Sequence, residues 1–182
     1  FRRDIAGCRS AAERALALDP NLAAAHAVKA RILSESGRHE EAGAEIEIAL
    51  RLDPESFEVN RGAGYLRFRQ KRLPEAARHF EKALSLMETD VSSPNMLMTC
   101  YTALGDREAL RRTAQVTLGR AQKALAQDPS NGAAMGFCCY ALATLGQAES
   151  AKGWMNRALL IEPDNANMRY NFACALACHL ND

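Results

Sequence analysis

Small and apolar side chains recur along this chain at helical spacing and in one order. A small residue is followed by a second apolar or small residue after four positions, by alanine after three more, and by proline after five. The four best examples are Cys8-Ala12-Ala15-Pro20, Ala42-Ile46-Ala49-Pro54, Ala76-Phe80-Ala83-Glu88 (where proline is lost) and Ala151-Met155-Ala158-Pro163. Steps of four and three keep these side chains on one face of a helix. Each segment is therefore predicted to be a helix that a neighbour approaches closely and that proline ends.

The pattern repeats with a fixed period. Pro20 and Pro54 are 34 residues apart, as are Pro129 and Pro163. A second marker precedes each of these helices, and it consists of Gly37, Lys71, Gly105 and Gly146. Glycine directly after a helix is typical of a left-handed C-terminal cap. Each unit is thus predicted to be a helix, a tight turn, a second helix and a proline, in an all-α fold of about ten helices.

One unit is longer than the others. The turn marker and the closing position are 17 residues apart in three units, but Gly105 and Pro129 are 24 apart. Seven additional residues are close to two helical turns, which predicts one lengthened helix near 106–127. The predicted array is 1–20 (half unit), 21–54, 55–88, 89–129 (extended), 130–163 and 164–182 (truncated half unit).

Two stretches resemble tetratricopeptide repeats, which have a period of 34 and the signature W-x2-L-G-x2-Y, A-x3-F, P. They are "VKARILSESGRHEEAGAEIEIALRLDP" and "CCYALATLGQAESAKGWMNRALLIEP". The tryptophan position holds His26, Asn60, Pro94 and Met135, so only the alanine-proline half of the signature is strong. The resemblance implies a superhelix of antiparallel helix pairs that serves as a scaffold for binding protein or peptide.

A narrower resemblance concerns "ALGDREALRRTAQVTLGRAQKALAQDPSNGAA" and "RALLIEPDNANMRYNFACALACHLND". Both are similar to the C-terminal tetratricopeptide region of bacterial class III adenylate cyclase-like proteins, where a TolB-like segment often accompanies the repeats. The resemblance implies a regulatory part of a cytoplasmic signalling protein. The family's catalytic aspartates and nucleotide-binding glycines have no counterpart here, so catalysis by this segment is not expected.

In such an array the first helix of each unit lines the concave face. The side chains expected there are Arg31, Arg61, Tyr65, Arg69, Met96, Thr99, Phe137, Tyr140, Tyr170 and Asn171. Arginine and tyrosine are enriched at binding hot spots, and together they would suit a peptide with acidic and apolar parts. The alternative is that the arginines are merely solvated and the tyrosines pack between helices. Capture of a heat-shock protein's C-terminal carboxylate is not expected, because Ala27 and Arg31 replace the lysine and asparagine that some family members use.

The competing hypothesis is a self-association module. The last segment, 165–179, reads as a first helix without its second, and Phe172, Leu176 and Leu180 would then lack a cover. An uncovered apolar face favours association between chains, so a homodimer formed through these residues and the long helix is the alternative function. The opening residues resemble neither a signal peptide nor a natural start, so we expect a fragment of a longer protein.

Composition narrows the chemistry. The chain has 182 residues with 23 basic and 22 acidic side chains, a net charge of +1 that predicts no general attraction to nucleic acid. No apolar run approaches the ~18–20 residues of a membrane span. The six cysteines lack C-x-x-C spacing and are expected to be free thiols in the cytoplasm; they are Cys8, Cys100, Cys138, Cys139, Cys174 and Cys178. No metal, cofactor or catalytic histidine set is expected.

Overall fold

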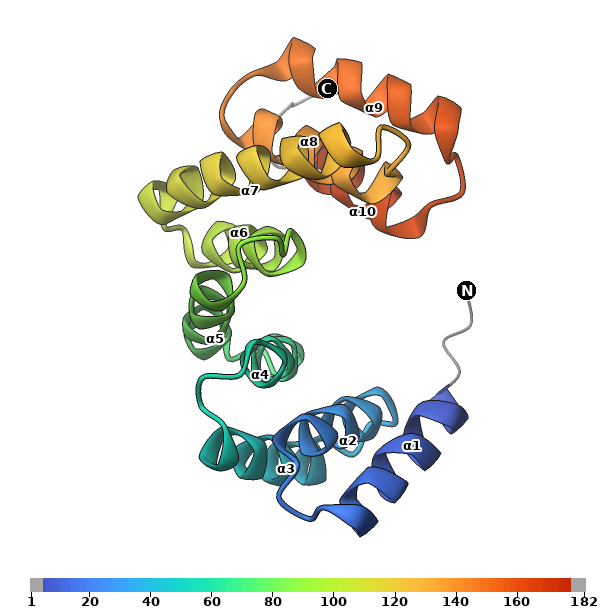
Figure 1. Cartoon of the computed structure of the whole chain (residues 1–182). Coiled ribbons are helices and arrows are strands. Elements are labelled where there is room, and N and C mark those ends of the chain that lie inside the picture. The colour runs from blue at the N-terminus through green and yellow to red at the C-terminus, as the bar shows by residue number, and fades with distance from the viewer. Residues whose placement is uncertain (1–4, 178–182) are drawn as a thin grey trace. The chain divides into compact units, whose positions relative to one another are not determined.

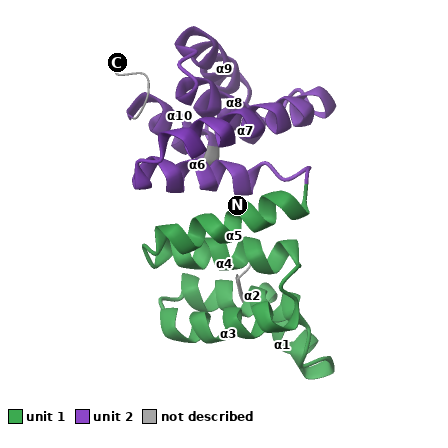
Figure 2. Ribbon diagram, turned by 90° about the vertical axis from the view of Figure 1, so that its left-hand side faces the viewer, with its two compact units in different colours: residues 1–87 green, residues 88–182 purple. Residues whose placement is uncertain are grey.

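The computed structural model describes residues 5–177, and this part of the chain forms ten α-helices and no strand (Figure 1). The all-α architecture and the number of helices predicted from the sequence are confirmed. Short turns join the helices, and within each of the two compact units described below most consecutive helices pack against each other as antiparallel neighbours. The chain divides into two compact units, residues 1–87 and 88–182 (Figure 2).

The first unit holds the first five helices: α1 (Ile5–Leu18), α2 (Ala23–Glu35), α3 (His39–Leu52), α4 (Phe57–Arg69) and α5 (Leu73–Leu86). Helix α2 packs against α3, and α4 packs against α5, as the two hairpins of consecutive units should. Helix α2 also packs against α1 and against α4. The first helices of two successive 34-residue repeats, α2 and α4, therefore lie side by side.

The second unit holds the other five described helices: α6 (Ser92–Leu104), α7 (Arg107–Gln127), α8 (Gly132–Thr144), α9 (Ala148–Ile161) and α10 (Ala166–Ala175). Helix α8 packs against α7, α9 and α10, and α6 packs against α7. Eleven of the thirteen residues of α8 are buried. It is the central helix of this unit.

The sequence predicts one continuous array, and the division into two compact units is additional information. The boundary falls between Met87 and Glu88. Glu88 is the position at which a unit would have closed with proline, so the lost proline coincides with the division. The assignment of repeats to the ranges given above stays a prediction.

The predicted turn markers are confirmed as left-handed caps. Gly37, Gly105 and Gly146 have φ angles of 79°, 73° and 80°. Lys71 occupies the same place with φ 60°, and it is the only residue other than glycine with a positive φ in the described chain. A side chain at such a position is strained by about 1 kcal/mol, yet the turn geometry of the repeat is retained.

The recurring acidic residue before proline has a structural role. Asp19 accepts a hydrogen bond from the backbone of Asn21 at 2.9 Å, and Asp53 accepts one from Glu55 at 3.2 Å. Asp128 does the same with Ser130 at 3.0 Å. Proline ends the helix, and the aspartate shapes the turn that leads to the next helix. This role of the aspartate was not predicted from the sequence.

The small-residue stripes form the contacts between helices. Ala42, Ile46 and Ala49 of α3 are fully buried, and so are their counterparts 34 residues later, Ala76, Phe80 and Ala83 of α5. Alanine at both ends of the stripe permits close backbone approach, and the larger residue between them fills the space above it.

The lengthened helix is confirmed as α7, which runs without interruption for 21 residues, about 32 Å at 1.5 Å per residue. Asp106 caps its start by accepting from the backbone of Ala109 at 3.0 Å. In the middle part of α7, Arg120 donates from Nη1 to the backbone oxygen of Asp90 at 2.9 Å. Helix α7 therefore holds the chain segment that leads into α6.

Candidate functional site

Three predicted groove residues form a strip along α4. Arg61, Tyr65 and Arg69 follow at intervals of four, which places them on one side of the helix. Arg61 and Tyr65 are half-buried, whereas Arg69 is exposed. Ser56 caps the start of α4 by accepting from the backbone of Val59 at 3.4 Å. We call Arg61, Tyr65 and Arg69 the α4 strip.

The tyrosine of the strip is held by the core. Its ring meets Phe80 of α5 edge to face, with centroids 5.3 Å apart and an interplanar angle of 88°. Phe80 is fully buried and lies directly over Gly64, where a Cβ atom would be 2.7 Å from the ring. The glycine therefore admits the phenylalanine, and the phenylalanine fixes the tyrosine. Tyr65 presents a fixed, partly accessible aromatic surface.

The two arginines of the strip differ in their surroundings. Arg61 donates to Glu58 at 2.6 Å, and its guanidinium lies 5.4 Å from the centre of the Phe57 ring, a cation–π contact that orients it. Arg69, in the last turn of α4, has no ion-pair partner among the described residues.

The neighbouring helix adds one more basic residue. Arg31 of α2 is the equivalent of Tyr65 one period earlier, and α2 packs against α4. Arg31 is half-buried and has no carboxylate partner in the part of the chain that the structure describes. We call Arg31 and the α4 strip together the α2–α4 face; four of the ten predicted groove residues thus gather on the first unit.

A fourth arginine of this region is structural. Arg67 points away from the strip and is 6% exposed. It donates to Glu47 of α3, and its Nε lies 3.6 Å from a carboxylate oxygen of Glu75 on α5. One buried guanidinium thus links three consecutive helices. Arg67 is not among the residues predicted from the sequence.

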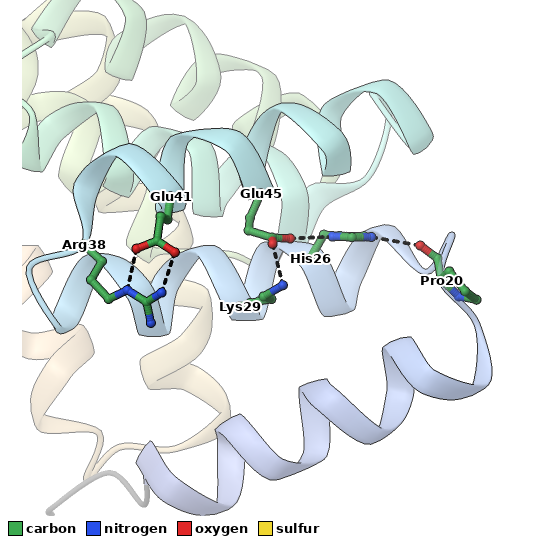
Figure 3. A network of polar contacts seen from close by, with 6 residues as sticks. All are labelled: Pro20, His26, Lys29, Arg38, Glu41 and Glu45. Atoms are coloured by element: carbon green, nitrogen blue, oxygen red, sulfur yellow. Dashed lines mark hydrogen bonds and ion pairs between the residues drawn. The ribbon is translucent and has the colours of Figure 1, made fainter.

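A network of polar contacts surrounds His26, the residue at the tryptophan position of the predicted repeat 21–54 (Figure 3). His26 contacts Glu45 through Nδ1 at 2.6 Å and the backbone oxygen of Pro20 through Nε2 at 2.9 Å. Lys29 pairs with the other oxygen of Glu45 at 2.5 Å. Burial raises the pKa of Glu45, but the hydrogen bonds from Lys29 and His26 outweigh it, so the pKa lies below its ordinary value.

The next predicted repeat, 55–88, has a similar arrangement with other residues. Asn60 occupies the tryptophan position, donates to the backbone oxygen of Pro54 at 2.8 Å and contacts His79 at 3.4 Å. Burial, followed by the charge of Arg67, lowers the pKa of His79. Both pairs, His26 with Glu45 and Asn60 with His79, are 19 residues apart. This shared spacing of polar residues is visible in the sequence, but neither contact was predicted from it.

A small hollow of about 200 Å³ lies beside the network, between α1, α2 and α3. Its charged lining balances three basic against three acidic side chains: Arg9, Lys29, Arg38, Glu13, Glu41 and Glu45. Arg38 and Glu41 form a two-bond pair, and Lys29 is bound to Glu45 (Figure 3). The hollow therefore offers no excess charge to an ion.

The second unit corrects the predicted groove. Phe137, Tyr140 and Asn171 are only 8%, 2% and 2% exposed, so they do not line an open surface. The Tyr140 hydroxyl is hydrogen-bonded to Thr102 of α6 at 3.2 Å. Asn95 of α6 donates to Asn171 of α10 at 3.2 Å across 76 residues of sequence. Helices α6, α8 and α10 bury this face among themselves.

The other predicted groove residues of the second unit do not form a cluster of exposed side chains. Met96 and Thr99 are half-buried, and the Thr99 hydroxyl donates to the backbone oxygen of Asn95 at 3.3 Å. Tyr170 is 52% exposed on α10. Of the six predicted groove residues on the second unit, Tyr170 alone is exposed.

The predicted self-association residues also separate. Phe172 is 5% exposed, which contradicts the expectation that it lacks a cover, because it packs within the second unit. Leu176 is 37% exposed. Leu180 lies outside the described residues. Of the predicted apolar face, one residue is therefore shown on the surface.

The described residues show no group of three or more metal-ligating side chains. Burial raises the pKa of the Cys100 thiol to about 11, and it raises the pKa of the Cys138 and Cys139 thiols to about 12, which makes these groups poor nucleophiles at neutral pH. None of the helices in the described range has the length and apolar composition that a bilayer crossing requires.

All protein-family matches to this chain are described as tetratricopeptide repeats. Tetratricopeptide repeat profiles match residues 2–55, 28–90 and 111–170. No curated protein matches the chain.

Several solved structures share the fold at low sequence identity. One is YrrB, described as a TPR protein with an unusual peptide-binding site, which is 24% identical, with 92% of this chain and 82% of YrrB covered and a TM-score of 0.62. MamA is 19% identical, with 90% and 91% covered and a TM-score of 0.62. The human IFIT1 dimer with PPP-AAAA is 22% identical, with 84% and 35% covered and a TM-score of 0.63.

Proposed function

Since the chain belongs to the tetratricopeptide repeat family, whose members are non-catalytic scaffolds for protein interaction, we propose that it binds a protein or peptide through the α2–α4 face. The observation that carries this proposal is the contrast in accessibility between the two units. The α2–α4 face keeps its large polar and aromatic side chains partly or fully accessible, whereas Phe137, Tyr140 and Asn171 are buried.

The side chains of this face are of the kinds that dominate binding energy. Arginine and tyrosine supply large contact areas with polar ends. Phe80 already restricts Tyr65, and Glu58 and Phe57 already orient Arg61. Pre-ordered side chains lose less conformational entropy when a partner binds. The peptide-binding site named for YrrB supports a peptide as the partner of a related fold.

The wider context rests on the sequence. The resemblance of residues 103–134 and 157–182 to the repeats of adenylate cyclase-like proteins supports a regulatory role within a bacterial, cytoplasmic signalling protein. The net charge of +1 supports a protein partner over nucleic acid, although IFIT1, which shares the fold, is described with PPP-AAAA.

The test is a selection of peptide binders from a random displayed library on the intact chain, followed by titration against variants. Tyr65→Ala and Arg69→Ala should each weaken the selected peptides about tenfold or more. Tyr170→Ala on α10 is the matched control and should leave their affinity unchanged. Loss of binding only with Tyr170→Ala would refute the α2–α4 face.

Self-association remains the second candidate because Tyr170 of α10 and Leu176, directly after this helix, are exposed, as is Leu160 at the end of α9, which is 87% exposed. Sedimentation of the chain over a wide concentration range tests it. A dimer that Leu176→Glu and Leu160→Glu convert to a monomer would support association through this end. A monomer at every concentration would remove the candidate.

A further inference from the structure

The geometry of the α4 strip restricts the kind of peptide that fits it; this inference rests on the function proposed above. Arg61 and Arg69 are separated by eight helical residues, which is about 12 Å along the helix axis. Tyr65 lies midway between them. A partner that lies along α4 therefore meets a cation, an aromatic ring and a second cation in order.

An extended peptide reproduces this spacing. Its residues advance by about 3.3 Å, so four steps cover about 13 Å. Side chains at positions i, i+2 and i+4 also point to the same side of an extended chain. Three side chains on one side of an extended peptide thus reach the three members of the strip without bending the backbone.

We propose that the partner of the α2–α4 face is an extended segment with the pattern acidic–x–apolar–x–acidic. The two carboxylates contact Arg61 and Arg69, and the apolar side chain between them packs on Tyr65. Guanidinium groups bind carboxylates through paired hydrogen bonds, and Arg69 has no competing carboxylate among the described residues. Arg61 shares its guanidinium with Glu58, which leaves other donors available.

The charges of α2 place this segment along α4. Glu35 stands on α2 at the position equivalent to Arg69, one period earlier, and Ala27 stands at the position equivalent to Arg61. An acidic peptide laid along α2 would therefore meet a carboxylate at one end and no cation at the other. Arg31, equivalent to Tyr65, is on the adjacent helix at the ~8–10 Å of packed helices and adds attraction from the side.

The recognised carboxylates belong to side chains inside a segment. Some family members hold a terminal carboxylate with a lysine and an asparagine. The α2–α4 face contains neither residue type, and Ala27 cannot donate a hydrogen bond from its side chain. A peptide with an amidated C-terminus should consequently bind as well as one with a free C-terminus.

The experiment measures the affinity of nine-residue, N-acetylated and C-amidated fluorescent peptides for the intact chain by anisotropy. Two glutamates are placed two, four, six or eight positions apart around a central leucine, with composition held constant. The spacing of four should bind about tenfold more tightly than the spacing of two. A maximum at eight, which is the spacing that a helical peptide needs, or equal affinities across the series would overturn the proposal.

Charge reversal assigns the two contacts. Arg61→Glu and Arg69→Glu should each weaken the peptide with spacing four about tenfold, and a peptide with lysine in place of the facing glutamate should recover most of that loss. The matched control is Arg51→Glu on α3, an exposed arginine outside the face that changes the net charge equally. Equal weakening by Arg51→Glu would reduce the effect to overall charge and overturn the proposal.

The outcomes separate this inference from the function on which it depends. If library-selected peptides require Tyr65 and Arg69 but lack the acidic–x–apolar–x–acidic pattern, the face binds peptides and the spacing inference is wrong. If selected peptides bind with full affinity to every variant of the face, the proposed function itself is wrong.

Discussion

The two units are built from the same 34-residue pattern, yet equivalent side chains differ in their solvent accessibility. In the first unit Tyr65 is partly accessible over Phe80, whereas in the second unit its counterpart Tyr140 is buried and bonded to Thr102. The second unit also contains the seven-residue extension of α7 and the contact between Asn95 and Asn171. A repeat pattern therefore determines which helices form and pack, but the accessibility of a face depends on how closely non-adjacent helices approach.

The largest expected effect concerns the support of the open face. Gly64→Ala would place a methyl group 2.7 Å from the Phe80 ring, and overpacking of this kind costs about 1–3 kcal/mol. Gly62→Ala, two residues away, meets Ile46 at 3.5 Å, an ordinary contact. Urea denaturation should show a clear loss for Gly64→Ala and little change or a small gain for Gly62→Ala. Equal stabilities of the two variants would contradict the packing described.

The second prediction concerns the stability of the buried contact between Asn95 and Asn171 in the second unit. Asn171→Ala deletes the acceptor for the buried Asn95 amide, and an unsatisfied buried amide costs about 1–3 kcal/mol. The double variant Asn95→Ala/Asn171→Ala should be more stable than the sum of the single losses predicts. Asn156→Ala on the exposed side of α9 is the control. Strictly additive losses would show that the two amides do not interact.

Sequence alone predicted most of the fold and only part of the site. The 34-residue period relates three of the left-handed turns, Gly37, Lys71 and Gly105, and the 17-residue interval to Pro163 located the fourth at Gly146. The 24-residue interval located the 21-residue α7. Burial of Tyr140 could not be predicted, because it occupies the same repeat position as Tyr65. Tyr140 packs against α6, where its hydroxyl is hydrogen-bonded to Thr102, and no local pattern encodes a contact between residues 38 apart in sequence.

The polar network gives the first unit a pH dependence. The pKa of Glu45 is lowered in the folded state, so its contribution to stability is present above the pKa of the unfolded chain and disappears as pH falls through the folded value. The free energy of unfolding should be about 1 kcal/mol larger for wild type than for Glu45→Gln at neutral pH. This difference should disappear in acid. In the second unit the positions equivalent to His26 hold Pro94 and Met135, which are buried and carry no titratable group. A difference that persists at low pH would contradict the assignment.

The smallest effect concerns the one strained turn. Lys71→Gly removes a side chain from φ 60° and should stabilise the first unit by about 0.5–1 kcal/mol. The equivalent turn of the second unit has Gly105, and Gly105→Lys should destabilise by a similar amount. Thermal melts of both variants measure the pair. A destabilising Lys71→Gly would mean that the lysine side chain makes a contact that offsets its strain.

Hydrogen exchange of the intact chain with and without the amidated acidic–x–apolar–x–acidic peptide tests the central claim most directly. We expect slower exchange in α4, residues 57–69, and no change in α8, residues 132–144. Protection confined to α8, with α4 unchanged, would contradict it.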